Sequence, residues 1–114
     1  MSDERLDLLA LCTEAKRLDR AGKEHKRVHL QVDGPDLFLA AVSSYNVVID
    51  LESRRIQHGC RDFLGQGREG KLCKHVAALL LAIDEGAAVT ILRGLTDPDG
   101  DWHLEVIGAR GFGS

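Results

Sequence analysis

The sequence predicts an α+β fold with an N-terminal helix, a short antiparallel sheet, a strand–loop–helix unit and a C-terminal hairpin. Two patterns carry this prediction. Apolar residues recur at helical spacing over residues 3–21 and 73–85. Between these helices, apolar and polar residues alternate from residue 28 to residue 58, as in strands that bury one face. The 114 residues suit a single domain over residues 1–114, which would bury about two-thirds of the surface of its unfolded chain.

The first predicted element is an amphipathic helix over residues 3–21. Its apolar stripe includes Leu8, Leu11 and Leu18, and Gly22 is typical of the residue that follows a helix. The stripe can face the protein's own sheet or a partner, and its own sheet is the more common case.

A meander of four short strands follows this helix. The alternation predicts strands over residues 28–32, 37–42, 45–51 and 54–58. The segments between them are short and rich in Asp, Gly, Pro or Ser, which favour tight turns. Short turns between neighbouring strands indicate antiparallel pairing.

The second half of the chain is predicted to continue with a loop, a helix and a hairpin. Residues 61–71 contain three glycines and are expected to form a loop. Residues 73–85 have the most regular helical pattern in the chain. Strands over residues 88–92 and 102–107 are expected to pair as a hairpin, and residues 108–114 are expected to form a flexible tail.

Composition limits the classes to which the chain can belong. The longest apolar run, residues 76–83, is far too short to cross a bilayer, so no membrane partner is expected. The N-terminus is acidic where a secretory signal would be basic, which predicts a cytoplasmic or otherwise intracellular protein. In such a reducing compartment, three cysteines, an odd number, favour metal binding over structural disulfides.

The sequence contains two pairs of residue types that commonly bind metal ions. His58 and Cys60 are separated by one residue, and so are Cys73 and His75. Alternate side chains of an extended strand point the same way, so His58 and Cys60 can reach one ion together. The second pair lies where a loop becomes a helix, which places Cys73 at or before the helix cap and His75 in the first turn. A helix N-terminus also favours a cysteine thiolate electrostatically.

These four side chains predict one structural zinc ion. Two nitrogens and two sulfurs within tetrahedral reach suit Zn²⁺, and four protein ligands leave no open position for a substrate water. Copper or iron could bind such a set, but nothing in the sequence calls for redox chemistry. If His58 is a bystander, the carboxylate of Asp62 is a nearby donor that could take its place.

A catalytic role for the same residues is less well supported. Cys60 and His75 could form a dyad like that of thiol hydrolases, but the sequence shows no partnering carboxamide, oxyanion loop or substrate pocket. We therefore expect neither an enzyme nor a small-molecule substrate. The remaining Cys and His residues are interpreted as structural, with Cys12 in the core and His25, His29 and His103 on the surface.

Two segments, YNVVIDLESRRIQHGCRDF and KLCKHVAALLLAI, show a known pattern. Over residues 45–85 they resemble a SWIM-type zinc finger, whose motif is C-x-C, a variable loop and C-x-H. The aromatic residue before the strand, the Arg-Asp-Phe after the second ligand and the Cys-Lys-His triplet before an Ala/Leu helix all fit. His58 stands where the family has its first cysteine, so the resemblance implies one structural zinc ion in a Cys₂His₂ set.

The resemblance also implies a function. SWIM domains are associated with DNA and protein binding. Small stand-alone members with a helix before the finger include accessory factors that act with RecA-type recombinase paralogues in DNA recombination. For this chain, the resemblance implies a zinc-binding adaptor that mediates protein and DNA interactions, accessory to recombination or repair through a RecA-type partner.

Two other functions are compatible with the residues. When the chain is divided into residues 1–50, 51–75 and 76–114, only 51–75 is net positive, in a chain of net charge −3. This segment could bind nucleic acid directly, although the acidity of the chain and its few aromatic residues argue against strong independent affinity. The other alternative is a metal-stabilised interaction module unrelated to DNA. The basic residues of the segment are Arg54, Arg55, Arg61, Arg68, Lys71 and Lys74.

Overall fold

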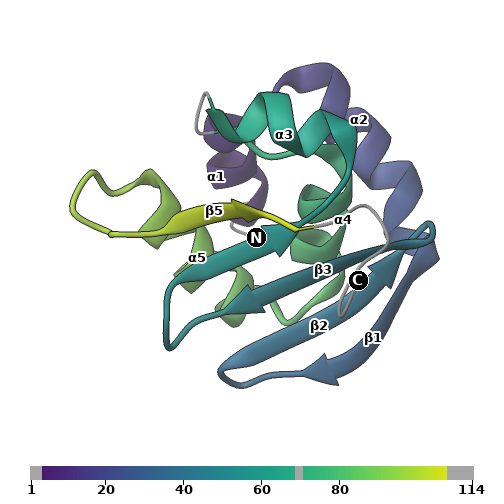
Figure 1. The fold of residues 1–114 in the computed structure, drawn as a ribbon. Coiled ribbons are helices and arrows are strands. Elements are labelled where there is room, and N and C mark those ends of the chain that lie inside the picture. The colour runs from purple at the N-terminus through teal and green to yellow at the C-terminus, as the bar shows by residue number, and fades with distance from the viewer. Residues whose placement is uncertain (1–3, 69–70, 108–114) are drawn as a thin grey trace.

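In the computed structural model, helices pack against one face of a five-stranded sheet (Figure 1). The structure describes residues 4–68 and 71–107, so the tail predicted over residues 108–114 lies outside it. Within the described ranges, no helix is long and apolar enough to cross a membrane. In chain order, the elements are α1 (Glu4–Cys12), α2 (Ala15–Glu24), the 3₁₀ helix η1 (His25–Arg27), β1 (Val28–Asp33), β2 (Leu37–Val42), β3 (Tyr45–Asp50), β4 (Arg55–His58), α3 (Arg61–Arg68), α4 (Lys74–Ala82), α5 (Glu85–Thr96) and β5 (His103–Val106).

The sheet has the strand order β1-β2-β3-β4-β5. Its first four strands pair antiparallel in sequence, which confirms the predicted meander. β5 pairs in parallel with β4 and forms the far edge. Val47 of β3 and Val106 of β5 both lie opposite His58, so the last residue of β4 is held between two strands.

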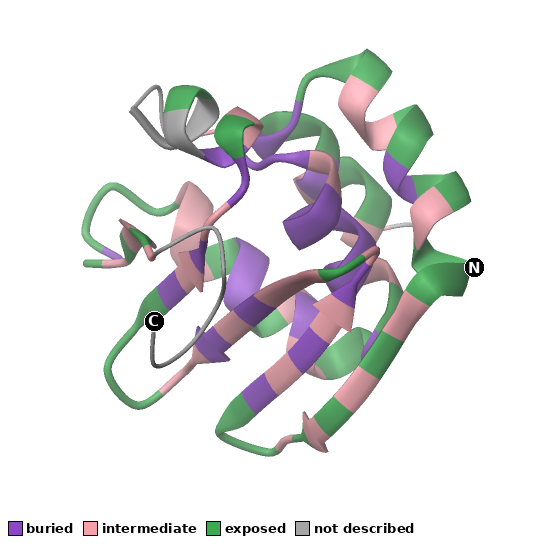
Figure 2. Cartoon of the chain, turned by 45° about the vertical axis from the view of Figure 1, so that its right-hand side comes forward, coloured by how far each residue is buried: buried purple, intermediate pink, exposed green. Residues whose placement is uncertain are grey.

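The core lies between the sheet and the helices (Figure 2). Alternate residues of β2, β3 and β4 face it, as the period of two in their sequence predicts. The other face of the sheet is more exposed, which is the usual arrangement for an antiparallel meander. The inward-facing side chains are Phe38, Ala40, Val42, Val47, Ile49, Ile56 and His58, all of them buried.

α4 is the central helix of the fold. Every residue from His75 to Leu80 is buried, because the helix packs against α2 on one side and against β1, β2 and β3 on the other. A helix that is apolar on most of its surface is stable only in such a position. The predicted helix over residues 73–85 is therefore confirmed, although it ends earlier, at Ala82.

The predicted N-terminal helix over residues 3–21 is two helices in the structure. α1 ends at Cys12 and α2 begins at Ala15. The carbonyl oxygen of Cys12 accepts the backbone N–H of Leu72 (2.8 Å), a bond to a distant segment that replaces one within a continuous helix. The apolar spacing runs through the break without interruption, so the sequence pattern could not reveal it.

Most of the segment predicted as a loop over residues 61–71 is the helix α3. The prediction relied on glycines, each of which weakens a helix by about 1 kcal/mol. Burial of Phe63 opposes this cost, since its side chain is fully excluded from solvent. Its backbone N–H also donates to the sulfur of Cys60 (3.2 Å), which caps the start of the helix. Tertiary packing therefore overrides the local preference.

The predicted C-terminal hairpin is wrong. Residues 88–92 lie inside α5, and the second expected strand is β5, which pairs with β4 instead. The side chain of Asp84 accepts the N–H of Ala87 (3.2 Å) and starts a new helix just after α4. A short apolar run fits either a strand or a buried helix, so periodicity alone could not decide between them.

Gly100 lies at a point of the α5–β5 loop that has no room for a side chain. A Cβ at this position would lie 2.0 Å from the carbonyl oxygen of Gly94, which is a backbone atom. We expect Gly100→Ala to lower the free energy of unfolding by about 2 kcal/mol in chemical denaturation. The same change at Gly22, with no atom within 4 Å, should be neutral or stabilise α2 by up to about 1 kcal/mol. Equal effects at the two positions would contradict this close approach.

Candidate metal centre

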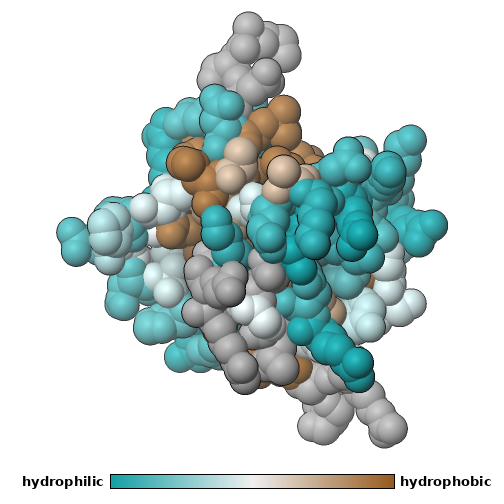
Figure 3. Space-filling view, turned by 90° about the horizontal axis from the view of Figure 1, so that it is seen from above, coloured by the Kyte–Doolittle hydropathy of each residue, from teal (hydrophilic) through white to brown (hydrophobic). Residues whose placement is uncertain are grey.

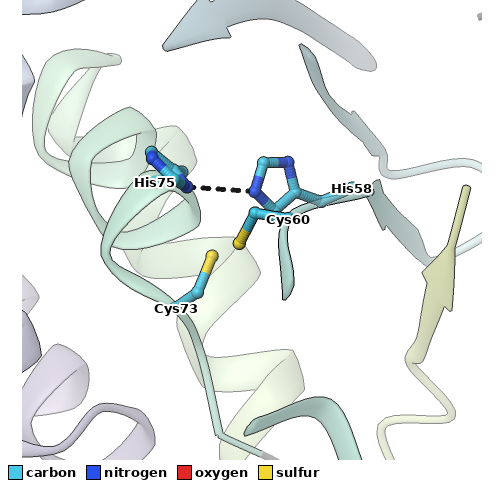
Figure 4. Close-up of side chains that lie close together, drawn as sticks. All are labelled: His58, Cys60, Cys73 and His75. Carbon is cyan, nitrogen blue, oxygen red and sulfur yellow. Dashed lines mark hydrogen bonds between the residues drawn. The ribbon is translucent and has the colours of Figure 1, made fainter. Parts of the chain in front are cut away.

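Four side chains converge where β4 ends and α4 begins (Figure 4). They are His58, Cys60, Cys73 and His75, and all four are buried. One ligand atom from each lies within 4.8 Å of the other three. The structure therefore brings together all four residues of the predicted ligand set, close enough to hold one metal ion.

The local backbone explains how each pair reaches the centre. His58 is the last residue of β4 and faces the core, and Cys60 follows two residues later. Cys73 is the N-cap of α4, with extended φ and ψ of −82° and 170°, and His75 lies in the first turn. Cys60 in turn precedes α3 and accepts the N–H of Phe63. Both sulfurs thus lie at helix N-termini, which favour the negative charge of a thiolate.

The two histidines present their nitrogens to the centre in a defined way. His58 Nδ1 donates to the carbonyl oxygen of Asn46 (2.7 Å), so His58 Nε2 carries the lone pair and faces inward. His75 Nδ1 lies 3.2 Å from it. Two nitrogens that bind one tetrahedral zinc ion at the usual bond lengths are about 3.3 Å apart. The distance between the two nitrogens therefore fits a shared ion. The carbonyl of Asn46 holds the His58 imidazole in the required tautomer.

The sulfurs of Cys60 and Cys73 each influence the pKa of the other. Hydrogen bonding with Cys73 is the main influence that lowers the pKa of Cys60, and hydrogen bonds with the two histidines add to it. Burial is the main influence that raises the pKa of Cys73, together with its hydrogen bond to Cys60 and the charge on that sulfur. The two shifts have opposite directions, and a bound divalent cation would supply the positive charge needed to hold both sulfurs as thiolates.

Aromatic rings enclose the centre. The centroid of the Tyr45 ring lies 4.8 Å from that of the His75 ring, with the two planes tilted by 32°. It lies 5.9 Å from the centroid of the His58 ring. Phe63 meets His58 edge-on at 5.3 Å. The donor residues are at most 5% exposed as a result. The sequence motif contains both aromatic residues but does not say that they cover the imidazoles, and the carbonyl of Asn46 leaves no side-chain signal at all.

Asp62, the alternative donor named from the sequence, points elsewhere. Its carboxylate is bound by the guanidinium of Arg17, with Nε 2.9 Å from Oδ2 and Nη2 2.7 Å from Oδ1. This pair links α3 to α2 and holds the pKa of Arg17 above its usual value, chiefly through the hydrogen bond with Asp62. Asp62 is therefore a structural residue beside the centre and not one of its four donors.

The other Cys and His residues lie where the sequence predicts. Cys12 is buried in the core, and His25, His29 and His103 are exposed. None of them belongs to the cluster of donors found among the described residues.

The five basic residues of the segment 51–75 whose side chains the structure describes lie in two places. Arg54 and Arg55 lie at the end of β4 away from His58, where Arg54 Nη1 donates to the Gly100 carbonyl (2.9 Å) and Arg55 Nε lies 3.3 Å from Glu105. Nearer the centre, Arg61 is exposed, Lys71 is half-buried and the Nζ of Lys74 lies 3.9 Å from Glu24. The side chain of Arg68 is outside the described part of the chain.

Comparison of the chain with protein-family models, with curated proteins and with solved structures finds no match.

Proposed function

We propose that this chain is a small zinc-binding adaptor whose ion has a structural role. The donor set supports zinc, because two thiolates and two imidazoles suit a borderline-soft d¹⁰ ion with tetrahedral geometry. Carboxylate and carbonyl oxygens, which magnesium and calcium prefer, are not among the donors.

The closed, buried donor set is the observation that supports a structural role for the ion. Four protein ligands complete a tetrahedral shell, and the exposed fraction of each is at most 5%, so no position is open to a substrate or a reactive water. We infer that the chain is not an enzyme at this centre. When bound, the ion would tie the end of β4 to the start of α4, and so join the sheet to its central helix.

The adaptor role needs a surface that the folded core presents to a partner. Leu6 and Leu11 of α1 are 45% and 67% exposed, and the face of the helices seen from above carries a hydrophobic patch (Figure 3). Leu6 and Leu11 are five residues apart, about 140° around the axis of α1, so they lie on two sides of the helix. Exposed large apolar side chains on a helix are candidates for contact with a protein partner. The choice of partner, a RecA-type recombinase paralogue in DNA recombination or repair, rests on the likeness of the motif to SWIM fingers.

Zinc analysis combined with a binding assay tests this proposal. Elemental analysis of the purified chain should find about one zinc ion per molecule. The zinc-loaded chain should bind a purified RecA-type paralogue from the same genome, and the double change Leu6→Asp, Leu11→Asp should weaken binding at least 10-fold. Leu37→Asp, at an exposed leucine of β2, is the matched control and should not.

The two halves of the proposal fail separately. A chain without stoichiometric zinc would refute the metal site. A zinc-loaded chain that binds no such paralogue would refute the partner but leave the structural zinc site in place.

A further inference from the structure

A row of basic side chains follows the outer face of α2. Lys16, Arg20 and Lys23 are spaced by four and three residues, which places them within about 60° of one another around the helix axis. Arg27 of η1 follows these residues in the chain and lies near Glu24, and all four side chains are exposed. We call these four residues the basic ridge. It is about 17 Å long at the rise of an α-helix.

The opposite face of α2 packs against the rest of the protein. Ala21 is fully buried, and Leu18 packs against the core. Arg17 is bound by Asp62, and Glu24 accepts from the hydroxyl of Ser43 and lies near Lys74. These contacts fix the position of α2, so the ridge faces outward, on a flank that Figure 3 shows as hydrophilic.

Few acidic groups offset the ridge. Residues 15–29 have a net charge of +4 in a chain of net charge −3, so the positive charge is concentrated here. Asp19 lies 3.8 Å from the Nζ of Lys23, but both side chains are at least 75% exposed, and such a pair is weak and screened by salt. Glu14 is turned toward Arg17. The electrostatic potential along the ridge is therefore positive and would attract a polyanion.

We propose that the basic ridge binds the phosphate backbone of duplex DNA without sequence preference. Phosphates of the two strands lie about every 1.7 Å along the duplex axis, so a ridge of this length can lie against several phosphates. Single-strand binders add aromatic side chains for base stacking, and the ridge has none. A membrane-binding helix would carry large apolar side chains beside its cations, whereas Leu18 faces the core. None of the four ridge residues is a donor of the metal centre or one of the six basic residues of segment 51–75.

Fluorescence anisotropy on the zinc-loaded chain with a labelled 20-base-pair duplex tests the proposal. Four phosphate contacts predict a slope of about −3.6 in log K against log salt, or roughly a 100-fold loss of affinity between 50 and 200 mM salt. The triple variant Lys16→Gln, Arg20→Gln, Lys23→Gln should bind at least 10-fold more weakly at 50 mM salt, with a slope reduced by about 2.7. Glutamine keeps the helix propensity of α2, so zinc content and Tm should not change.

A matched control removes the same charge elsewhere. Arg54→Gln, Arg55→Gln, Arg61→Gln also lowers the net charge by three, and its affinity should stay within about 2-fold of the wild type. An equal loss in both triple variants would assign binding to net charge and overturn the ridge. Three further results would also overturn it: no binding of wild type at 100 µM protein in about 20 mM salt, tighter binding to single-stranded DNA, or binding to phosphatidylserine vesicles in its place. Zinc content is measured independently, so none of these results bears on the metal site.

Discussion

Cys73→Ala should leave the chain without zinc and without a cooperative folded state at 37 °C. Cys73 is fully buried and supplies one of the four donors. The binding free energy of a structural zinc ion is about 10 kcal/mol or more, and it contributes directly to folding. A domain of this size has a total stability of about 5–15 kcal/mol. Loss of the ion therefore removes most or all of the free energy of unfolding. Far-ultraviolet circular dichroism during heating measures this loss.

Cys12 offers the matched control for this prediction. It is also buried, at 6% exposure, but it lies in the core outside the donor cluster. Cys12→Ala should keep one zinc ion per chain and lose only about 1 kcal/mol of stability. A strong chelator should unfold the wild type and the Cys12 variant alike. If Cys73→Ala melts at the wild-type temperature, the ion does not stabilise the fold.

Phe63→Ala should lower both the stability of the fold and the affinity of the centre for zinc. The ring is fully buried and meets His58 edge-on, so its removal leaves a cavity beside a donor. Large-to-small changes of this kind cost about 3–5 kcal/mol. The imidazole of His58 would also lose a contact that orients it, and such supporting contacts are worth about 10–100-fold in metal affinity. Competition titration with a chromophoric zinc chelator measures this affinity.

Phe38→Ala separates the two effects. Phe38 is equally buried, at 2% exposure, but it lies opposite Ile49 at the end of the sheet away from His58. It should lose a similar free energy of unfolding and keep the zinc affinity of the folded chain within about 3-fold. If both variants lose zinc affinity equally, the loss reflects general destabilisation, and Phe63 has no special role at the centre.

The four strands of the meander could be predicted closely from the sequence because their signals are local. Alternation over residues 37–42 specifies the inward face of a strand, and the short polar segments on either side specify the turns. The strand β2 has these bounds in the structure. The ligand set could be named for the same reason, since one intervening residue brings His58 and Cys60 to one side of the chain.

The helices show where local signals fail. Residues 88–92 have an apolar run that suits a strand, and α3 contains glycines that suit a loop. Both segments are helical because of interactions that apolar spacing does not show. The side chain of Asp84 caps α5, and the buried ring of Phe63 holds α3 in place. The break between α1 and α2 likewise depends on a backbone bond to Leu72, sixty residues away in the chain.

The sequence by itself determined the α+β class, the meander and the identity of the four candidate donors, because spacing along the chain encodes each of them. Only the tertiary structure decided how the centre is closed. The carbonyl of Asn46 and the rings of Tyr45 and Phe63 contact the donor imidazoles, and the motif gives the order of these residues along the chain but not their contacts in space. The tautomer of His58 and the exclusion of solvent depend on distances between these residues, and such distances exist only once the helices have packed against the sheet.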